Sequence, residues 1–502
     1  MNANIILAPI LIHLITAVIS LFLWGRVLPQ KILSLIGSLL VLISSVLIFF
    51  LNQKWGSIIV FAGNWKPPYG ITFVTDTLST IMLLLTAIVG LAVSIYSHVA
   101  ISTSRIKFGY YPIYHFLLMG LSGAFLTGDI FNMYVWFEVV IISSFVLLTL
   151  GGKRMQMEGA VKYMAINMLA SIIFLTGIGI LYGLTGSLNI ADIGTKVRTI
   201  ENQGLVQVTS LLFFFGFGIK SAVFPLYFWL PSSYHTPPSA IAAIFGGLLT
   251  KMGIYSLLRV FTVIFYPDNF MLNFFCAIAI MTMITGALGA MNKKSLRRMF
   301  SYLIVCHIGY LIAGIGLYTE LAISGVIFYL IHDIIIKSNL FMMTGIIYKI
   351  RASTDMRRLG GLYKDYPKLS FVMAIILFSL IGIPPLSGFW AKIPFITESI
   401  HEGRFVLLAV ILFSSFVTLI IISKLWSEVF WKDLPKPNPT EIDKFAPLKL
   451  YEKISLVFPV LLLASITLYI GLNAGAIIKV TDKVAYELLH PDIYIESVLG
   501  KN

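Results

Sequence analysis

The sequence predicts an all-α polytopic membrane protein, and three observations support this prediction. First, 58% of the 502 residues are hydrophobic and only 12% are charged, whereas a soluble domain carries about 25% charged residues. Second, apolar segments long enough to cross a bilayer as helices recur along the whole chain. Third, lysine and arginine concentrate in alternate loops, as the positive-inside rule requires of a membrane protein. The net charge of +14 therefore reflects membrane orientation and does not indicate a nucleic-acid partner.

The apolar pattern predicts about fourteen transmembrane helices. We expect them over residues 3–24, 31–51, 73–98, 111–128, 130–150, 161–184, 206–231, 239–262, 271–291, 300–318, 321–347, 369–397, 405–430 and 453–478. The loops after odd-numbered spans carry most of the basic residues, so we expect these loops in the cytoplasm. Both termini should then lie on the outer face of the cell membrane. A secreted domain behind a cleaved signal peptide does not fit this pattern.

An internal repeat divides the chain. Shifting the sequence by 166 residues superimposes eight positions, which are Gly159, Tyr163, Gly179, Tyr182, Val206, Leu211, Gly216 and Ser221 on Gly325, Tyr329, Gly345, Tyr348, Val372, Leu377, Gly382 and Ser387. The repeat unit is five spans, an odd number, so the two copies must have opposite topology. Inverted repeats are typical of transporters. We therefore expect four parts: N-terminal helices (1–110), a first five-helix repeat (111–262), a second, inverted repeat (263–430), and a linker with the last helix and tail (431–502).

Two of the predicted helices should be broken within the membrane. The seventh span contains GFGIKSAVFPLYFWLP (216–231), and the twelfth contains GIPPLSGFWAKIPF (382–395). Proline removes a backbone donor and disrupts the helix before it, and interrupted helices at matching positions of two repeats indicate a transport site. Each broken helix carries one lysine, Lys220 or Lys392.

Ionisable residues inside the spans are the candidate functional residues, because a charge at the bilayer centre costs about 2.5–3.5 kcal/mol on insertion scales. Glu138 is alone among apolar neighbours, and Lys220 and Lys251 in later spans of the same repeat are its expected partners. A protonated, hydrogen-bonded structural carboxylate is the alternative. A buried lysine that loses its hydration can carry a proton near neutral pH, whereas a lysine that reaches the interface has no such role.

The segment YLIHDIIIKSN (329–339) holds three more candidates, His332, Asp333 and Lys337. Asp333 and Lys337 are four residues apart on a helix and could simply neutralise each other. His332 titrates near neutral pH and could pass protons between lysines.

The remaining in-span groups carry less weight. A structural role is at least as well supported as a functional one for His235 and for His307. Lys424 is expected to form a local ion pair with Glu428.

The candidates form a proton pathway. Its members are Glu138, Lys220, Lys251, His332, Lys337 and Lys392, with His235, His307 and Asp333 as weaker candidates. Such groups, strung through a helical bundle, can relay protons through intervening water. The sequence has no nucleotide-binding motif, and its two cysteines lie in apolar runs without metal-ligand spacing. We therefore expect no cofactor, no metal and no enzymatic activity, with energy supplied by an ion gradient or by partner subunits.

Three stretches resemble one family closely. GDIFNMYVWFE (128–138), GFGIKSAVFPLYFWLPSSYHTPPSAIAAIFGGLLTKMGIY (216–255) and GIPPLSGFWAK (382–392) are similar to the antiporter-like family. This family comprises the proton-pumping membrane subunits of respiratory complex I, related hydrogenase subunits, and the large subunits of Mrp-type multisubunit Na+/H+ antiporters. The first stretch and Lys392, where some complex I homologues have glutamate, look most like the D subunits of Mrp antiporters. The longer A subunits have additional C-terminal spans.

The resemblance implies a proton-translocating membrane subunit of a multisubunit Na+/H+ antiporter. Glu138 would form a pair with Lys220. Lys251 would continue the central polar axis, and Lys337, with His332 nearby, would be the central lysine of the second repeat. Lys392 would be the last lysine of the pathway. Asp333 departs from the family pattern. The implied partners are other membrane subunits, protons and Na+ as transported ions, and the lipid bilayer, with no nucleic acid. The alternative function is a pump subunit of a redox-driven complex I-like or hydrogenase-type enzyme, and a non-transporting scaffold is a third class that the in-span lysines argue against.

Overall fold

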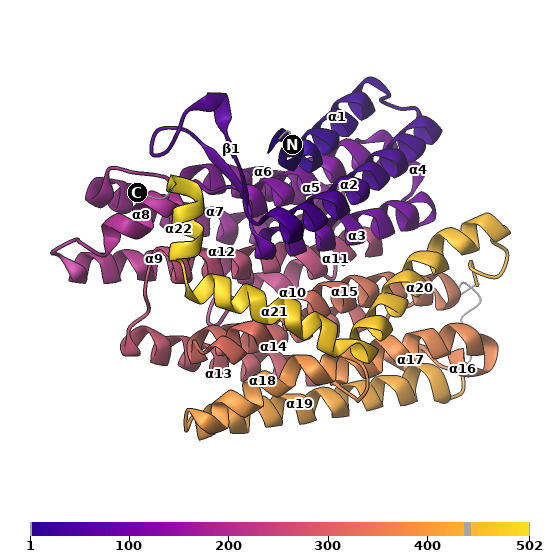
Figure 1. Cartoon of the computed structure of the whole chain (residues 1–502). Coiled ribbons are helices and arrows are strands. Elements are labelled where there is room, and N and C mark those ends of the chain that lie inside the picture. Colours follow the sequence, from indigo (N-terminus) through magenta and orange to yellow (C-terminus); the bar gives the residue numbers. More distant parts are fainter. Residues whose placement is uncertain (1–2, 436–442, 501–502) are drawn as a thin grey trace.

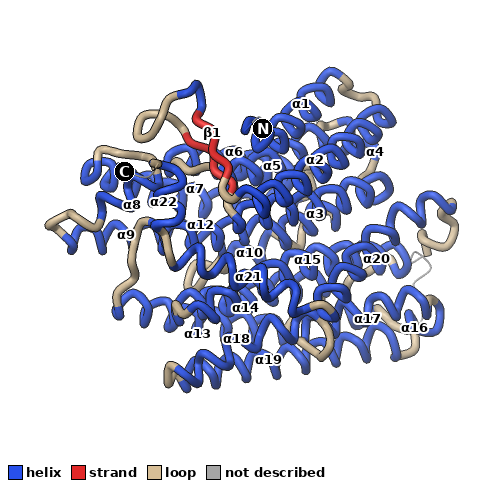
Figure 2. Tube along the Cα trace, in the orientation of Figure 1, coloured by secondary structure: helices blue, strands red, loops and turns tan. Residues whose placement is uncertain are grey.

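The computed structural model describes residues 3–435 and 443–500, and most of them form helices (Figures 1 and 2). Among the described residues, twelve helices are long and apolar enough to cross a membrane. This confirms the predicted all-α membrane fold. The number fourteen stays a prediction, because two of the expected spans form shorter helices, α5 with 17 residues and α17 with 15 residues.

The N-terminal part consists of membrane helices and one short hairpin. Its elements are η1 (Ala3–Leu7), α1 (Ala8–Phe22), α2 (Val27–Trp55), β1 (Ile58–Phe61), η2 (Ala62–Asn64), β2 (Thr72–Thr75), α3 (Thr77–Ala100) and α4 (Thr103–Lys107). The two strands pair antiparallel, with Ile58 opposite Thr75. Asp76 caps α3 by accepting the backbone N–H of Ser79, which satisfies one of the free donors at the helix start.

The next elements follow the spans of the first predicted repeat. They are α5 (Tyr110–Leu126), α6 (Ile130–Thr149), α7 (Arg154–Thr185), α8 (Ile190–Val197), α9 (Gln203–Ser221), α10 (Trp229–Ser233), α11 (Ser239–Ile244), the π-helix η3 (Phe245–Leu249) and α12 (Thr250–Val263). The helices α11, η3 and α12 run on without interruption as one span, Ser239–Val263.

The second half and the C-terminal part contain the remaining helices. They are α13 (Asn269–Met291), α14 (Leu296–Leu317), α15 (Glu320–Arg351), η4 (Met356–Arg358), α16 (Leu362–Asp365), α17 (Pro367–Ile381), α18 (Ser387–His401), α19 (Phe405–Trp426), η5 (Ser427–Trp431), α20 (Leu450–Leu472), α21 (Ala474–Leu489) and α22 (Asp492–Leu499). The relation of the two halves as inverted repeats stays a prediction.

Both predicted helix breaks are present. Helix α9 ends at Ser221, and the next residue, Ala222, has a φ of 63°. Helix α17 ends at Ile381, and Gly382 follows with a φ of 95°. These left-handed residues end each helix within the predicted span, and they leave carbonyl groups of the last turn free for other partners.

The helices that carry Lys251, His307, Asp333 and Lys337 lie in the centre of the molecule. The apolar window of Ser239–Val263 is 100% buried, and those of α14 and α15 are 94% buried. The corresponding value is only 39% for α2, α7 and the α19 span. In Figure 1, α15 accordingly runs through the middle of the bundle. Charges on these central helices are shielded from lipid by protein, which is where ionisable residues are tolerated in membrane proteins.

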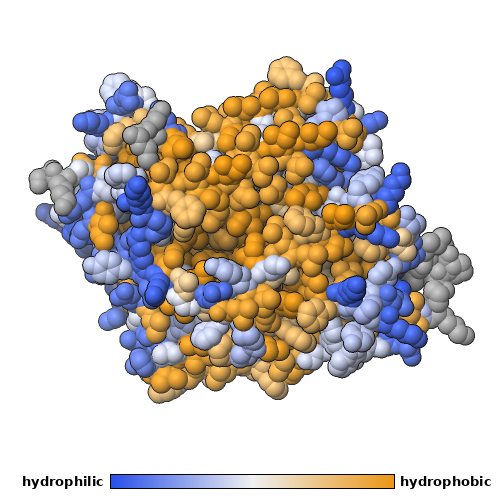
Figure 3. Space-filling model, turned by 45° about the vertical axis from the view of Figure 1, so that its right-hand side comes forward, coloured by the Kyte–Doolittle hydropathy of each residue, from blue (hydrophilic) through white to orange (hydrophobic). Residues whose placement is uncertain are grey.

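The surface has the form expected of a protein in a bilayer. In Figure 3, hydrophobic residues cover a broad central region, and hydrophilic residues border it on two opposite sides. The hairpin contacts η1 at the N-terminus, and the C-terminal helix α22 packs against α8. Residues near these elements are joined by bridges between Phe73 and Thr127 and between Asp129 and Asn189. The two termini therefore lie on the same side of the membrane region.

Candidate functional site

Asp333 on α15 is the centre of the candidate site. Its Oδ2 atom lies 2.7 Å from Nζ of Lys251 on α12, and both side chains are fully buried. Its Oδ1 atom lies 3.1 Å from Nδ1 of His307 and 3.8 Å from Nζ of Lys337. The local pair of Asp333 and Lys337 is therefore present, but the closest cation to Asp333 is Lys251, which belongs to another helix. A single buried carboxylate is thus shared by two lysines and a histidine.

The approach of α12 to α15 depends on two glycines. Gly247 lies in the π-helix η3, where a Cβ atom would come within 2.0 Å of Oγ of Ser338 on α15. Gly246 is equally confined, because a Cβ atom there would lie 2.5 Å from the ring of Phe341. The π-helix also changes the local hydrogen bonding, and Nζ of Lys251 donates to the Gly246 carbonyl at 2.8 Å. Such π-bulges are frequent at functional sites.

His307 and Lys337 complete the cluster around Asp333. Nδ1 of His307 lies 2.9 Å from the hydroxyl of Tyr329, while its Nε2 atom has no hydrogen-bond partner among the described residues. Nζ of Lys337 donates to the carbonyl of Leu303 at 3.1 Å. His307 was a weaker candidate than His332, but it is His307 that contacts the central carboxylate. The sequence did not favour His307 over His332 as the neighbour of Asp333, because His307 lies on α14 and His332 lies next to Asp333 in the segment 329–339.

A second polar group continues from α15 to the break before α18. Nδ1 of His332 lies 2.8 Å from Oγ of Ser387, which in turn lies 3.0 Å from Oγ of Ser379. Nζ of Lys392 donates to the carbonyl of Ile381 at 2.8 Å. Ile381 is the last residue of α17, so its carbonyl is one that the break sets free. The break before α18 thus supplies Lys392 with a backbone acceptor.

Glu138 and Lys220 do not form the expected direct ion pair. Nζ of Lys220 donates to Oγ of Ser171 at 3.1 Å and lies 4.3 Å from the centre of the Phe137 ring. Glu138 is half-buried rather than buried, because its face of α6 is only partly covered by this chain. Its Oε1 atom has no hydrogen-bond partner among the described residues. A face that is left open in this way suits contact with another protein of a membrane complex.

A small cavity adjoins Lys220. It has a volume of about 20 Å³ and is lined by side chains from α6, α7, α9, α10 and η3–α12, together with Tyr234, which directly follows α10. The hydroxyl of Tyr234 has no partner among the described residues. The lining is mostly apolar but includes Lys220, Asn167 and Tyr234, and a cavity of this size with polar partners has room for about one water molecule. Such a water would lie between Lys220 and α12, the helix that carries Lys251.

The other candidates lie apart from this site. Nδ1 of His235 contacts the carbonyl of Pro231 at 2.8 Å, and Nε of Arg298 donates to its Nε2 atom at 3.1 Å. Burial, with an added contribution from the charge of Arg298, lowers the pKa of His235 to about 4. The predicted Lys424–Glu428 pair is wrong, because Glu428 lies 2.9 Å from Lys432 instead.

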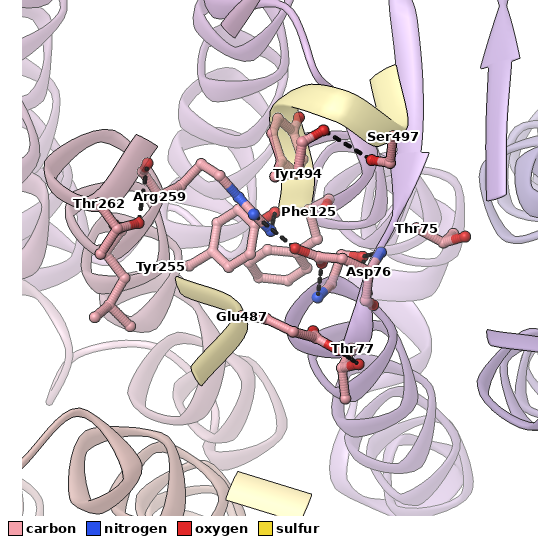
Figure 4. Close-up of polar contacts among 12 residues, drawn as sticks. Thr75, Asp76, Thr77, Phe125, Tyr255, Arg259, Thr262, Glu487, Tyr494 and Ser497 are labelled. Atoms are coloured by element: carbon pink, nitrogen blue, oxygen red, sulfur yellow. Dashed lines mark hydrogen bonds and ion pairs between the residues drawn. The ribbon is translucent and has the colours of Figure 1, made fainter. Parts of the chain in front are cut away.

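Sequence reasoning missed a second buried ion pair. Arg259 lies within the span Ser239–Val263, and its Nη1 atom is 2.6 Å from Oδ2 of Asp76, the cap of α3. Figure 4 shows Arg259 reaching toward Asp76 between Tyr255 and Tyr494, with Glu487 of α21 nearby. The guanidinium lies 4.9 Å from the centre of the Tyr494 ring. Its position near the end of a predicted span made Arg259 look like a loop residue.

A histidine pair in the N-terminal part was also missed. Nδ1 of His13 lies 3.0 Å from Nδ1 of His115, and Nε2 of His115 lies 2.9 Å from Oγ of Ser34. His13 and His115 are 102 positions apart in the sequence, so no local pattern indicates that they meet. No group of three or more histidine, cysteine, aspartate or glutamate residues suited to a metal ion occurs within 3–435 and 443–500.

Comparisons with known proteins agree with this architecture. The family model described as "NADH:quinone oxidoreductase/Mrp antiporter, TM" matches residues 127–418. The D subunit of the Na(+)/H(+) antiporter of Alkalihalophilus pseudofirmus is 40% identical over 500 residues, which cover 99% of this chain and 99% of that protein.

Two solved structures are similar over the whole chain. A chain of the Mrp complex from Dietzia sp. DQ12-45-1b superposes with a TM-score of 0.90 and 27% identity, covering 100% of both chains. A chain of the membrane-bound sulfane sulfur reductase, an archaeal respiratory membrane complex, superposes with a TM-score of 0.89 and 26% identity, covering 99% of both chains. The chain therefore belongs to the NADH:quinone oxidoreductase/Mrp antiporter family of membrane proteins.

Proposed function

We propose that this chain is a proton-translocating membrane subunit of a multisubunit Na+/H+ antiporter. The name of the relative from Alkalihalophilus pseudofirmus and the similarity to a chain of the Dietzia Mrp complex support this function. We further propose that the chain lies in the plasma membrane with both termini on the outer face and works with other membrane subunits. Na+ would cross at another subunit or at an interface, coupled electrostatically to protons in this chain.

The buried cluster around Asp333 is the observation that carries the proposal. Lys251 and Lys337 share one carboxylate at 2.7 and 3.8 Å, so the charge of either lysine depends on where that carboxylate lies. A buried ammonium group is stable only while a counter-ion compensates its desolvation. Movement of the carboxylate from Lys251 toward Lys337 would favour proton release from Lys251 and retention by Lys337. The shared carboxylate would thereby link proton transfer in the two halves.

The proposed pathway runs through the whole row of polar groups. Protons would reach Lys251 from Glu138 and Lys220 through water in the cavity beside Lys220. They would then continue through His307, Asp333 and Lys337 to His332 and Lys392. The hydrogen bond between His332 and Ser387 supports this last connection, because Ser387 begins the helix that carries Lys392.

Exchange by the whole complex in membrane vesicles tests the proposal. We expect Glu138→Ala and Lys220→Ala each to abolish Na+/H+ exchange while the complex still assembles. Lys424→Ala is the matched control, because Lys424 is an exposed lysine of α19 outside the pathway. Retained exchange in both pathway variants would contradict the proposed roles. Exchange by this chain purified alone would contradict the dependence on partner subunits.

A redox-driven pump subunit is the second candidate function. The similarity to a chain of the sulfane sulfur reductase favours it, because related membrane subunits serve both kinds of complex. The neighbouring genes distinguish the two candidates: flavin and iron–sulfur proteins indicate a redox-driven complex, and small membrane proteins alone indicate an antiporter. Sodium resistance of a deletion strain, restored by this chain only together with its partner subunits, would support the antiporter.

A further inference from the structure

A basic pocket lies on the side of the molecule opposite the two termini. It has a volume of about 330 Å³ and opens where α7 and α14 begin and where α15 ends. Five cationic residues line it, namely Arg105, Lys153, Arg297, Lys349 and Lys444. The described lining contains no carboxylate. The pocket therefore concentrates positive charge from both halves of the chain and from the linker before α20.

Arg297, which lines this pocket, has a hydrogen-bond donor that no described residue accepts. Its Nη1 atom donates to the carbonyl of Pro237 at 3.2 Å, and its guanidinium lies 5.9 Å from the centre of the Tyr348 ring. Its Nε atom, however, is buried and has no hydrogen-bond partner among the described residues. An unpaired donor on a buried cation is costly, and a guanidinium is suited to bind two oxygens of one anion. Arg297 therefore forms no ion pair with a carboxylate of residues 3–435 or 443–500.

A second unpaired group lies at the same site. Gln156, which is buried and lines the pocket, has a side-chain amide oxygen without a partner among the described residues. The two ends of an amide can exchange places, so this side chain can present either a donor or an acceptor. A pocket of several hundred Å³ with a few convergent polar groups is the usual form of a small-molecule site.

We propose that this pocket binds a phosphate-bearing anion. The five cations and the unfilled donor of Arg297 fit phosphate oxygens, and Tyr348 and Gln156 provide contacts for the group attached to them. An anion held here would compensate the repulsion among cations of both halves, and would join α7 to α14 and α15. Two sources share this chemistry: the headgroup of an anionic phospholipid, which basic pockets on the cytoplasmic side of membrane proteins bind, and free phosphate.

Binding to the purified, delipidated complex tests the proposal. The probes are cardiolipin, phosphatidylcholine and inorganic phosphate, and the readouts are bound lipid by native mass spectrometry and the thermal unfolding temperature of the complex. We expect cardiolipin to bind and to raise the unfolding temperature, and phosphatidylcholine to do neither. Binding of cardiolipin alone identifies a lipid headgroup as the source, whereas equal stabilisation by inorganic phosphate identifies free phosphate. Because transport is not a readout, the result is independent of the proposed function.

Matched variants locate the binding. Lys153→Gln and Arg297→Gln remove pocket charges, and Arg154→Gln and Arg298→Gln remove the neighbouring charges that do not line the pocket. Each charge near a membrane surface contributes about fivefold to binding of an anionic lipid. We expect each pocket variant to weaken binding by about fivefold or more, and each control to leave it unchanged.

Several results would overturn the proposal. They are equal binding of phosphatidylcholine and cardiolipin, no binding of either cardiolipin or phosphate, and equal losses in the pocket variants and the controls. The Lys153→Gln variant still tests the proposal if the Arg297 variant does not assemble. Lys153 is an exposed residue just before α7, so its substitution removes no buried side chain.

Discussion

Helix α12 carries two buried cations that differ in their surroundings. Lys251 and Arg259 are about two turns apart, and each pairs with a carboxylate from another helix, at 2.7 Å and 2.6 Å. Asp76, the partner of Arg259, also accepts the backbone N–H of Ser79 at 2.8 Å. Asp333, the partner of Lys251, is shared with other titratable groups, and its Oδ2 atom accepts no well-aligned hydrogen bond from the described residues.

The difference separates a fixed ion pair from an exchangeable one. Arginine stays protonated in proteins, and its planar group stacks on aromatic rings such as that of Tyr494. Lysine can lose its proton when it is desolvated. We therefore expect the pair of Arg259 and Asp76 to stay charged and to join α12 to α3, and the pair of Lys251 and Asp333 to exchange a proton. Burial of an ion pair is thus compatible with either role, and the chemistry of the cation decides which.

The largest expected effect is that of Asp333→Asn. This change removes the shared carboxylate, so we expect exchange in vesicles to fall by at least about a hundredfold, the usual contribution of a positioned proton-transfer group. It also leaves the buried Lys251 without its closest counter-ion, which costs about 3–5 kcal/mol when a buried pair is broken. Thermal unfolding of the assembled complex measures this second effect.

A double variant separates the two consequences of that change. Replacing the pair by apolar groups, with Lys251→Met and Asp333→Leu, should restore part of the lost stability, because Lys251 no longer remains as a buried cation without its closest counter-ion. Lys337 also loses its contact with Asp333 in this variant, so the recovery should be incomplete. Exchange should stay absent in the double variant. Recovery of exchange would show that the Lys251–Asp333 pair is structural, like the pair of Arg259 and Asp76.

The next effect is that of Arg259→Ala, which should lower stability without stopping exchange. The change leaves Asp76 as an unpaired buried charge, and we expect the free energy of unfolding to fall by about 3–5 kcal/mol. Exchange normalised to assembled complex should remain within about twofold of the unsubstituted protein. Arg259→Lys, which keeps the charge and loses the planar contacts, should have a smaller effect on stability. Loss of exchange in a fully assembled Arg259→Lys complex would place Arg259 in the proton pathway.

A smaller effect is expected from the glycine that brings α12 to α15. In Gly247→Ala the new Cβ atom would lie 2.0 Å from Oγ of Ser338 and 3.1 Å from the carbonyl oxygen of Ile334, so Ser338 must rotate and η3 must move away from α15. Overpacking of this kind costs about 1–3 kcal/mol, and a longer distance between Lys251 and Asp333 should slow exchange. The matched control is Gly179→Ala on α7, where a Cβ atom would meet no atom within 4 Å. Adding Ser338→Ala to Gly247→Ala should recover part of the loss, and the absence of any recovery would contradict the steric explanation.

The sequence predicted the membrane fold and most of the polar groups, because hydropathy and in-span charge are local properties. The two helix breaks followed from proline and glycine at positions such as Pro225 and Gly382. The sequence could not predict which partner each charge has. The i,i+4 spacing of Asp333 and Lys337 suggested a local pair, but the close contact is to Lys251, 82 positions earlier in the chain.

Long-range contacts explain the other misses as well. Glu138 was expected to be the buried partner of Lys220, but the orientation of α6 leaves it half-exposed. The sequence of one helix does not fix this orientation, because it depends on the helices that pack around it. The pairing of Arg259 with Asp76 joins residues 183 positions apart, so neither sequence neighbourhood indicates it. What the sequence could not show was how the span Ser239–Val263 packs, with α11 against both α3 and α15 and η3 against α15, because this packing depends on contacts of the whole bundle.

The smallest expected effect is that of His235→Gln, which tests a histidine outside both ion pairs. Burial lowers the pKa of His235 to about 4 from 6.5, so the unfolded chain binds more protons here than the folded one between these pH values. His235 should therefore make the stability of the complex fall as the pH decreases from about 6.5 to about 4. His235→Gln should weaken this pH dependence, measured by thermal unfolding, and should leave exchange at pH 7 and above within about twofold. A loss of exchange at neutral pH, where His235 is uncharged in the folded protein, would mean that this histidine acts with the central site despite its distance from Asp333.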